Sequence, residues 1–503
     1  MTTHERDDVE TDTVVVVEDR KVERTPLPKL QLAIVFLIQF AEPVTATVIY
    51  PFVNQFVRET GITGGDETKT GYYAGIVEST FFFSETLTVF AWGWLSDELG
   101  RKPVLLMGPL GLALAMLAFG LSKTFWPLVV FRAFQGFFNG NIGVSKSVMA
   151  EITDSTNIGD AYALAPLMWA SGTTVGPMLG GLLSNPAVQW PDTFGKIAFY
   201  RDYPYFLPCA AASFVAFLSF AISSIAMKET LPSSRRSKLR DSWGRLISKF
   251  SPNSNEAGAN ASLLAGTEHS GYGTSGTECA IPAPVEEVKP PLSALLVFDY
   301  VITILNYGFF SFIDMSVTAL IPLVYSTPLE YGGLGMDPFK IGTIMATYGV
   351  LNGTMSVLFL GPLVRRYGPT KVYQCGIFAI FISLSAFPIE NILARRAGGI
   401  DAWVALVIVI QFAAQTVLSP CYASMGILVI QVCPHKLLMG SANGVAQMAT
   451  SGTRAFAPAV ASSLFSISIQ RNWAGGYAVY YMIMVLLVGL ICGSRYLPTP
   501  IKP

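Results

Sequence analysis

Residues 93–103 read Gly-Trp-Leu-Ser-Asp-Glu-Leu-Gly-Arg-Lys-Pro, a short charged stretch between two long apolar segments. The flanking segments, residues 72–96 and 103–122, are each long enough to cross a hydrocarbon core of roughly 30 Å at about 1.5 Å per residue. The two glycines allow a sharp reversal of the chain, and Pro103 suits the first turn of the next helix. The stretch therefore predicts a tight polar turn at one edge of a membrane.

The composition is that of a membrane protein. Hydrophobic residues make up 51% of the chain and charged residues only 13%, whereas about a quarter of a soluble domain is charged. Mean hydropathy is +0.48. The six cysteines and three histidines are scattered without metal-ligand spacing, and no nucleotide-binding loop is present. We therefore expect free thiols and no enzyme, with no metal, no cofactor and no nucleic-acid partner.

Apolar runs along the chain predict twelve membrane spans in two sets of six. We expect an all-α polytopic membrane protein whose 12 transmembrane helices form two pseudo-symmetric six-helix bundles. The first set covers residues 30–53, 72–96, 103–122, 126–150, 160–184 and 204–227. The second set covers residues 297–325, 339–361, 371–392, 402–431, 437–467 and 475–496.

Polar segments separate and flank the two predicted bundles. The bundles occupy residues 30–228 and 294–496, and the Ser-, Gly- and Pro-rich linker at 229–293 lacks the apolar content of a folded core. We expect a disordered tail at 1–29 and a short tail at 497–503. Basic residues near the short loops place tails, linker and the 93–103 turn on the cytoplasmic side, although Arg395 and Arg396 then fall outside.

A degenerate copy of the 93–103 turn lies in the second half. Residues 361–371 keep the Gly-x-Leu-x-x-x-x-Gly frame and fall between the eighth and ninth predicted spans, which is the equivalent place. Arg365 occupies the position that matches Asp97, so the charge pattern is not repeated. This spacing indicates that the two halves derive from one repeat.

The spacing of Gly93, Asp97, Gly100, Arg101 and Lys102 resembles the signature loop between the second and third spans of the major facilitator superfamily. In that family the loop aspartate is thought to latch the two halves together on the cytoplasmic side. The resemblance implies such a latch here, with Asp97 pairing with Arg101 and with the start of the eleventh span near residues 435–441. A carboxylate at a positive helix end is the physical basis of that contact.

An arginine lies inside the fourth predicted span. Arg132 and Gln135 occur in the apolar run 128–136, where a charge is costly unless it faces a cavity or a partner. The run resembles the superfamily's Arg-x-x-Gln-Gly motif, whose arginine is thought to take part in proton coupling. A structural arginine bound to a helix carbonyl is the alternative interpretation.

The fifth predicted span carries small residues at helical spacing. Gly172, Gly176, Pro177, Gly180 and Gly181 would let a neighbouring helix backbone approach closely. Their order resembles the antiporter motif of the drug:proton antiporters, which is largely absent from sugar-type symporters. The resemblance therefore implies export rather than import.

Acidic residues inside spans supply candidate coupling groups, because intramembrane charges are usually functional. We predict that Glu42, midway along the first span, couples protons with Arg132 as its partner, and that Asp314 of the seventh span contributes. Glu78 has interfacial placement as an alternative, and Glu78 and Glu85 could instead form structural contacts with serines or backbone. The residues predicted to line the substrate cavity are Glu78, Glu85, Gln135, Asn306 and Tyr307.

The phrases at residues 41–43, 92–97, 325–328 and 332–335 resemble fungal transporters related to the tetracycline-resistance and zinc-induced-facilitator-like groups. This resemblance implies a monomeric, proton-coupled exporter of a drug or secondary metabolite that works by alternating access. The predicted spans contain several acidic residues but one clear arginine, Arg132, and this excess of negative charge predicts a cationic or amine-bearing substrate. We expect the plasma membrane rather than the vacuolar membrane. A nutrient importer on the same fold and a non-transporting membrane receptor are the alternatives.

Overall fold

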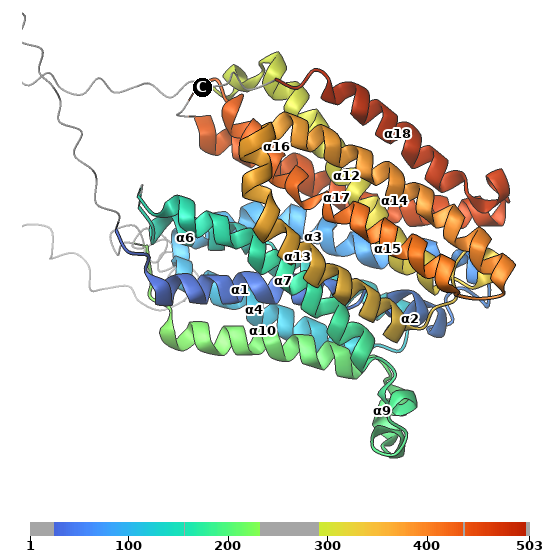
Figure 1. Cartoon of the computed structure of the whole chain (residues 1–503). Coiled ribbons are helices and arrows are strands. Elements are labelled where there is room, and N and C mark those ends of the chain that lie inside the picture. Colours follow the sequence, from blue (N-terminus) through green and yellow to red (C-terminus); the bar gives the residue numbers. More distant parts are fainter. Residues whose placement is uncertain (1–24, 155, 232–290, 436–437, 499–503) are drawn as a thin grey trace, which may run out of the picture.

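The computed structural model describes residues 25–154, 156–231, 291–435 and 438–498, and these ranges are helical without strands (Figure 1). Most of the predicted 229–293 linker, most of the 1–29 tail and the last residues of the 497–503 tail lie outside the described residues. The helices before the linker are α1 (Lys29–Thr47), α2 (Val53–Glu59), α3 (Thr70–Leu99), α4 (Arg101–Gly120), α5 (Phe125–Asn139), α6 (Ile142–Glu151), α7 (Ile158–Leu183), α8 (Pro186–Gln189), α9 (Ala198–Asp202) and α10 (Phe206–Ala226).

The helices after the linker repeat this order. They are α12 (Phe298–Ser326), α13 (Pro338–Tyr367), α14 (Pro369–Ala397), α15 (Ala402–Thr416), α16 (Ser419–Gln431), α17 (Met439–Gln470) and α18 (Ala478–Ser494). Each of the twelve predicted spans corresponds to one long helix or to two helices in line, so the expected twelve-span architecture is confirmed.

Two spans are broken, at equivalent places in the halves. The fourth span divides into α5 and α6, and the tenth into α15 and α16, whereas the short helix α2 begins where the predicted first span ends. In addition, α13 is bent by 52° between Ser356 and Gly361. Among the described residues, six helices pass a test of length and hydropathy for spanning a membrane, or seven if the bent α13 counts as one span. Residues 402–431, which hold α15 and α16, count as one of the six, whereas the apolar α18 has only 17 residues and falls short in length.

The repeated turn has the same backbone geometry in both halves. Gly100 ends α3 and starts α4 at φ 110°, and Gly368 ends α13 and starts α14 at φ 80°. Positive φ is disfavoured for residues with a side chain, which explains why both copies keep glycine. The internal repeat predicted from the 361–371 sequence is therefore visible in the structure.

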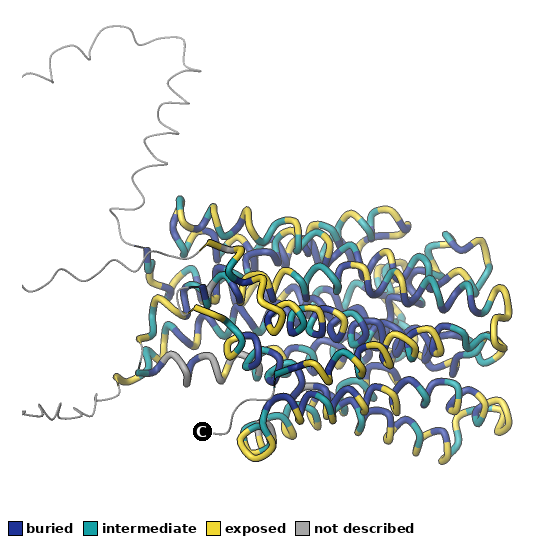
Figure 2. Tube along the Cα trace, turned by 90° about the horizontal axis from the view of Figure 1, so that it is seen from above, coloured by how far each residue is buried: buried dark blue, intermediate teal, exposed yellow. Residues whose placement is uncertain are grey.

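Large apolar side chains cover the outside of the bundle. Phe214, Ile225 and Val485 are 64%, 86% and 72% exposed, far beyond the apolar exposure of a soluble surface. Figure 2 shows that buried residues gather along the inner faces of the helices while exposed residues lie outermost. This arrangement fits a protein whose outer surface faces lipid.

The ends of the bundle can be told apart by their loops. We call the end that carries residues 93–103 the loop end; the described chain starts and finishes there (Figure 1). The opposite end, here the far end, carries α2, α8 and α9. At the far end α3 packs along α17, and α7 packs along α13, so each pair joins the two halves.

The closest approaches between the halves lie in the far half of these helices. A Cβ on Gly181 of α7 would lie 2.6 Å from the Cα of Gly342 on α13. A Cβ on Gly71 of α3 would lie 2.5 Å from the carbonyl oxygen of Ser462 on α17. Backbone packed this tightly leaves no passage along these two helix pairs, so the halves are closed against each other at the far end.

Candidate functional site

Two acidic side chains and a lysine meet near the middle of the N-terminal half. Glu42 lies on α1 beside the internal Pro43 and is only 6% exposed. Its Oε1 accepts a hydrogen bond of 2.9 Å from the Asn139 side chain on α5. Glu85 of α3 and Lys146 of α6 interact electrostatically with Glu42 and with each other. Four helices therefore bring these residues into one cluster.

A second charged cluster lies in the C-terminal half. Arg454 of α17 donates from Nε to the Ser311 hydroxyl on α12 at 3.1 Å. Its guanidinium lies 5.3 Å from the ring centroid of Tyr422 on α16, a cation–π contact. The Tyr422 hydroxyl donates to Asp314 Oδ2 at 2.7 Å, and the Tyr307 ring lies 6.1 Å from that of Tyr422.

The two clusters lie at the same level of the interface between the halves, because the rings of Phe83 and Phe456, close neighbours of Glu85 and Arg454 in the sequence, are 6.4 Å apart. The charge of Arg454 acts on both Glu42 and Glu85, although it forms no ion pair within the described residues. Glu85, Asp314 and Arg454 are half-buried rather than buried, even though they lie in the middle of their helices. These side chains therefore keep some accessible surface at the middle of their helices.

Arg132 forms a different set of contacts from those predicted. It is completely buried, and it donates to Gln135 Oε1 at 2.7 Å and to the Ala46 carbonyl oxygen of α1 at 2.9 Å. The expected pairing of Arg132 with Glu42 is thus not formed in the described structure. A cation at the carbonyl end of a helix is favourable, so this geometry matches the structural alternative for Arg132.

The remaining predicted cavity residues are distributed between three places. Glu78 is 2% exposed and interacts with the charge of Arg132, so it is not at a water interface. Asn306 is buried and donates to the Ile302 carbonyl oxygen at 2.9 Å, with its side chain toward Gly493 of α18. Of the predicted cavity set, Glu85 and Tyr307 therefore belong to the central clusters, whereas Glu78, Gln135 and Asn306 lie outside them.

Sequence reasoning missed Asn139, Lys146, Tyr422 and Arg454. Arg454 and Lys146 lie within predicted spans and carry the same signal that singled out Arg132, namely a charge in membrane-spanning sequence. Their presence corrects the assumption that Arg132 stands alone against several acids. Asn139 and Tyr422 carry no comparable signal, because neutral polar residues are common in membrane helices.

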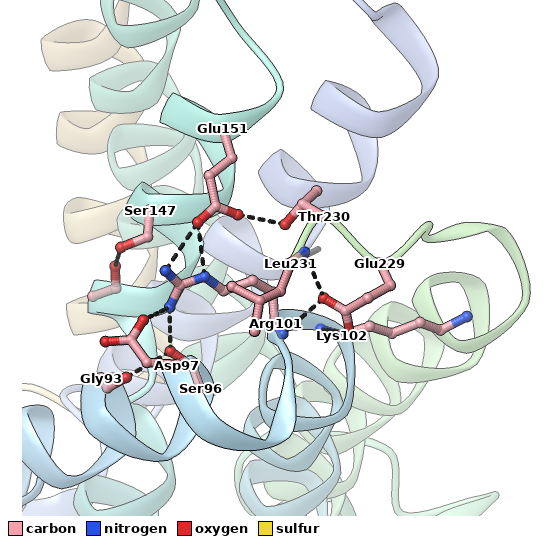
Figure 3. A network of polar contacts seen from close by, with 11 residues as sticks. Gly93, Ser96, Asp97, Arg101, Lys102, Ser147, Glu151, Glu229, Thr230 and Leu231 are labelled. Carbon is pink, nitrogen blue, oxygen red and sulfur yellow. Dashed lines mark hydrogen bonds and ion pairs between the residues drawn. The ribbon is translucent and has the colours of Figure 1, made fainter. Parts of the chain in front are cut away.

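The 93–103 turn forms a polar network at the loop end (Figure 3). Arg101 Nη1 lies 2.7 Å from Asp97 Oδ1, and Arg101 Nη2 lies 2.9 Å from Glu151 Oε1 at the end of α6. The carboxylate of Glu229 accepts hydrogen bonds from the backbone N–H groups of Arg101 and Lys102, at 2.9 and 3.2 Å. An acidic group thus satisfies the first donors of α4, where the helix dipole is positive.

The predicted latch is half formed. The contact between Asp97 and Arg101 is present, but the Asp97 side chain is 64% exposed and forms no ion pair or hydrogen bond with the start of α17 among the described residues. Gly93 accepts a hydrogen bond from the Ser96 hydroxyl at 2.7 Å, inside the same turn. The network therefore holds the loop-end turns of the N-terminal half together without joining the two halves.

The glycines of the fifth span face two partners. A Cβ on Gly172 or Gly176 would overlap α1, at Pro43 and Thr47, and one on Gly180 would overlap the carbonyl of Val48. Gly181 instead contacts α13 of the other half, and Gly342 of α13 contacts the carbonyl oxygen of Pro177 in return. The motif thus permits close packing both within the N-terminal half and across the interface.

Comparison with known proteins identifies the family. The model of the Major Facilitator Superfamily matches residues 35–327. The chain belongs to the Major Facilitator Superfamily. Members of this family are transporters and not enzymes, so the resemblance inferred from the 93–103 turn is confirmed.

Similar proteins of this superfamily include fungal transporters. The chain is 30% identical over 493 residues to the major facilitator-type transporter psiT2 of Psilocybe cyanescens, covering 94% of this chain and 92% of the relative. It is 26% identical to the multidrug transporter mfsB of Aspergillus fumigatus, covering 92% and 82%. The crystal structure of a D-xylose–proton symporter has the same fold, with a TM-score of 0.63 at 12% identity over 93% of this chain and 98% of that one.

Proposed function

We propose that this Major Facilitator Superfamily member is a proton-coupled exporter of an amine-bearing small molecule, with Glu42 as the proton-binding carboxyl group. The observation that carries the proposal is the arrangement of charge at the interface: Glu42 and Glu85 of one half interact electrostatically with Arg454 of the other, and backbone of the two halves packs tightly at the far end. Charged groups at mid-membrane depth, reachable from one side, are what alternating access requires.

Competition between a proton and the amine for the same carboxylates would couple proton entry to substrate export. An ionised Glu42 or Glu85 attracts a cationic amine, and a protonated carboxyl group does not. Asn139 donates a hydrogen bond to Glu42, and Lys146 interacts electrostatically with both carboxylates, so these two residues would help to replace the amine when it leaves. Binding of a proton from the far side would then release the substrate there.

The direction of transport rests on the glycine motif and on the relatives. Gly172, Gly176 and Gly180 pack on α1, the helix that carries Glu42, so the motif supports the helix that would bind the proton. The multidrug transporter mfsB matches along most of the chain. The D-xylose–proton symporter has the same architecture, so fold alone does not set direction.

We infer that the loop end is the cytoplasmic side and that this conformation is the cytoplasm-facing state. Asp97 would reach the start of α17 only when the loop end closes, which accounts for its exposure here. We further propose that residues 30–228 and 294–496 rock as two units within one monomer. The plasma membrane is the proposed location.

The deciding experiment measures efflux from proteoliposomes under an imposed proton gradient. We expect gradient-driven export in the wild type and its loss in Glu42→Gln, which keeps the size of the side chain but binds no proton. Glu330→Gln, an exposed carboxylate at the far end, is the matched control and should export normally. Unchanged export by Glu42→Gln would move coupling to Glu85 or Asp314, and gradient-driven uptake by the wild type would refute the exporter.

A further inference from the structure

Arg454 differs from the other arginine inside the bundle. Arg132 is completely buried and is held by Gln135 and by the Ala46 carbonyl oxygen. Arg454 is half-buried, and its contacts are the Ser311 hydroxyl and the Tyr422 side chain. A guanidinium carries five N–H donors, and these two partners leave several of them available. The surrounding side chains therefore orient Arg454 but leave part of its hydrogen-bonding capacity unused.

Charge is distributed unevenly around Arg454. Glu42 and Glu85 lie on α1 and α3 of one half, whereas Arg454 lies on α17 of the other. The charges interact, yet no ion pair with a carboxylate forms among the described residues. In its own half, Asp314 accepts the hydrogen bond of Tyr422 instead of pairing with Arg454. Arg454 thus lies at the interface between the halves, beside the Phe83–Phe456 ring contact, with guanidinium donors that no carboxylate occupies among the described residues.

We propose that Arg454 binds an anionic group of the transported molecule while Glu42 and Glu85 bind its amine, so that the substrate is a zwitterion. This inference rests on the proposed function and specifies its substrate class. The planar fork of a guanidinium matches a carboxylate or phosphate with two parallel hydrogen bonds. Ser311 fixes Nε, and the Tyr422 ring supports the guanidinium plane, so little orientational freedom is lost on binding.

A purely cationic substrate fits this arrangement less well. An amine placed between the clusters would be attracted by Glu42 and Glu85 but would also approach Arg454 and Lys146. A zwitterion satisfies both sides at once, because its anionic group offsets the guanidinium that the amine would otherwise meet. It would also connect the N-terminal half to the C-terminal half through its two ends.

Matched probes test this assignment by equilibrium binding to the purified full chain in nanodiscs, without a proton gradient. The probes are two series that differ only in charge: tryptamine, tryptophan and indole-3-propionate, and phenethylamine, phenylalanine and 3-phenylpropionate. We expect the zwitterion to bind most tightly in at least one series. Arg454→Gln should weaken that zwitterion by about ten- to hundredfold and leave the matching amine nearly unchanged, because only charged hydrogen bonds to the anion are lost.

Two further variants separate recognition from folding. Arg454→Lys keeps the charge without the fork and should lose part of the zwitterion affinity, whereas Arg471→Gln, an exposed far-end arginine, should lose none. An amine that binds as tightly as the zwitterion in both series, or a zwitterion preference that survives Arg454→Gln, would overturn the assignment. If the assignment fails in this way, gradient-driven export of an amine would still support the proposed exporter. Conversely, if a tightly bound zwitterion moves without a proton gradient, the zwitterion assignment stands and the proposed proton coupling is refuted.

Discussion

The guanidinium of Arg58 donates to the carbonyl oxygen of Ser326 at 3.2 Å and thereby joins α2 to the last residue of α12. The same side chain lies 3.4 Å from the carboxylate of Glu67. The final carbonyls of a helix lack partners within the helix and carry partial negative charge, so a cation there is stabilising. Arg58 therefore links the two halves at the far end, beside a pocket of about 450 Å³.

Arg58→Gln should weaken far-end closure. The loss of the charged hydrogen bond to Ser326, which joins the halves, should raise the open population by roughly tenfold. A cysteine placed at Gln55, which lines the same pocket, would report opening through its rate of labelling by a membrane-impermeant maleimide. Lys69→Gln removes an ion pair at the same end but within one half, so it should leave the rate unchanged. Equal rates in Arg58→Gln and wild type would contradict this role.

Gly181→Ala should prevent the far end from closing fully. Its new Cβ would meet the backbone of α13 at Gly342 Cα and Pro338 O, 2.6 and 2.8 Å away, and backbone atoms cannot move aside as a flexible side chain can. We expect faster maleimide labelling at residue 55 and slower export, with little change in thermal stability. Gly489→Ala, where nothing lies within 4 Å of the added Cβ, is the control.

Gly176→Ala should lower thermal stability and leave far-end closure unchanged, the opposite of Gly181→Ala. Its Cβ would overlap Thr47 and the backbone of Val44 and Val48, all within the N-terminal half. Overpacking of this kind costs about 1–3 kcal/mol, so we expect a lower unfolding temperature in detergent. Labelling at residue 55 should change little. If the two alanine variants behaved alike, the division of this motif between two packing partners would be wrong.

The twelve spans could be predicted because long apolar runs have one stable arrangement in a bilayer, a helix that satisfies its own backbone. The breaks between α5 and α6, at Gly140 and Asn141, and between α15 and α16, at Val417 and Leu418, were not predicted, because each spans only two residues and hydropathy averaged over a whole span does not detect it. Prolines that were visible in the sequence, such as Pro43, lie within helices instead of ending them. Hydropathy therefore located the spans but not their internal geometry.

The partners of the charged residues could not be predicted for a related reason. Which face of α5 meets α1 depends on helix rotation and tilt, which are set by packing across the whole half. Arg132 consequently reaches the Ala46 carbonyl oxygen, and Glu42, one turn earlier on the same helix, meets Asn139. Glu229 lies beyond the last span of its half, so its contact with the start of α4 had no sequence signal.

Arg101→Gln should loosen the loop end of the N-terminal half. The variant loses the contacts of Arg101 with Asp97 and Glu151, which tie the turn after α3 to the end of α6. Because both acids are partly exposed, we expect a loss of about 1–2 kcal/mol in the free energy of unfolding, smaller at high salt. Lys102→Gln is the matched control, since its side chain points away from this network (Figure 3). A loss of equal size in both variants, or one insensitive to salt, would refute the network.

Glu390 of α14 should tolerate removal of its charge but not of its volume. It is 0% exposed, both carboxylate oxygens lack hydrogen-bond partners, and the nearby Tyr480 hydroxyl is also unpartnered. An uncompensated charge in such a place is costly, so Glu390→Gln should unfold at the same or a higher temperature than wild type. Glu390→Ala leaves a cavity beside the stacked rings of Phe387 and Tyr480 and should cost about 2–4 kcal/mol. Thermal unfolding in detergent distinguishes the two, and a glutamine variant as unstable as the alanine variant would show that the carboxyl group itself is required.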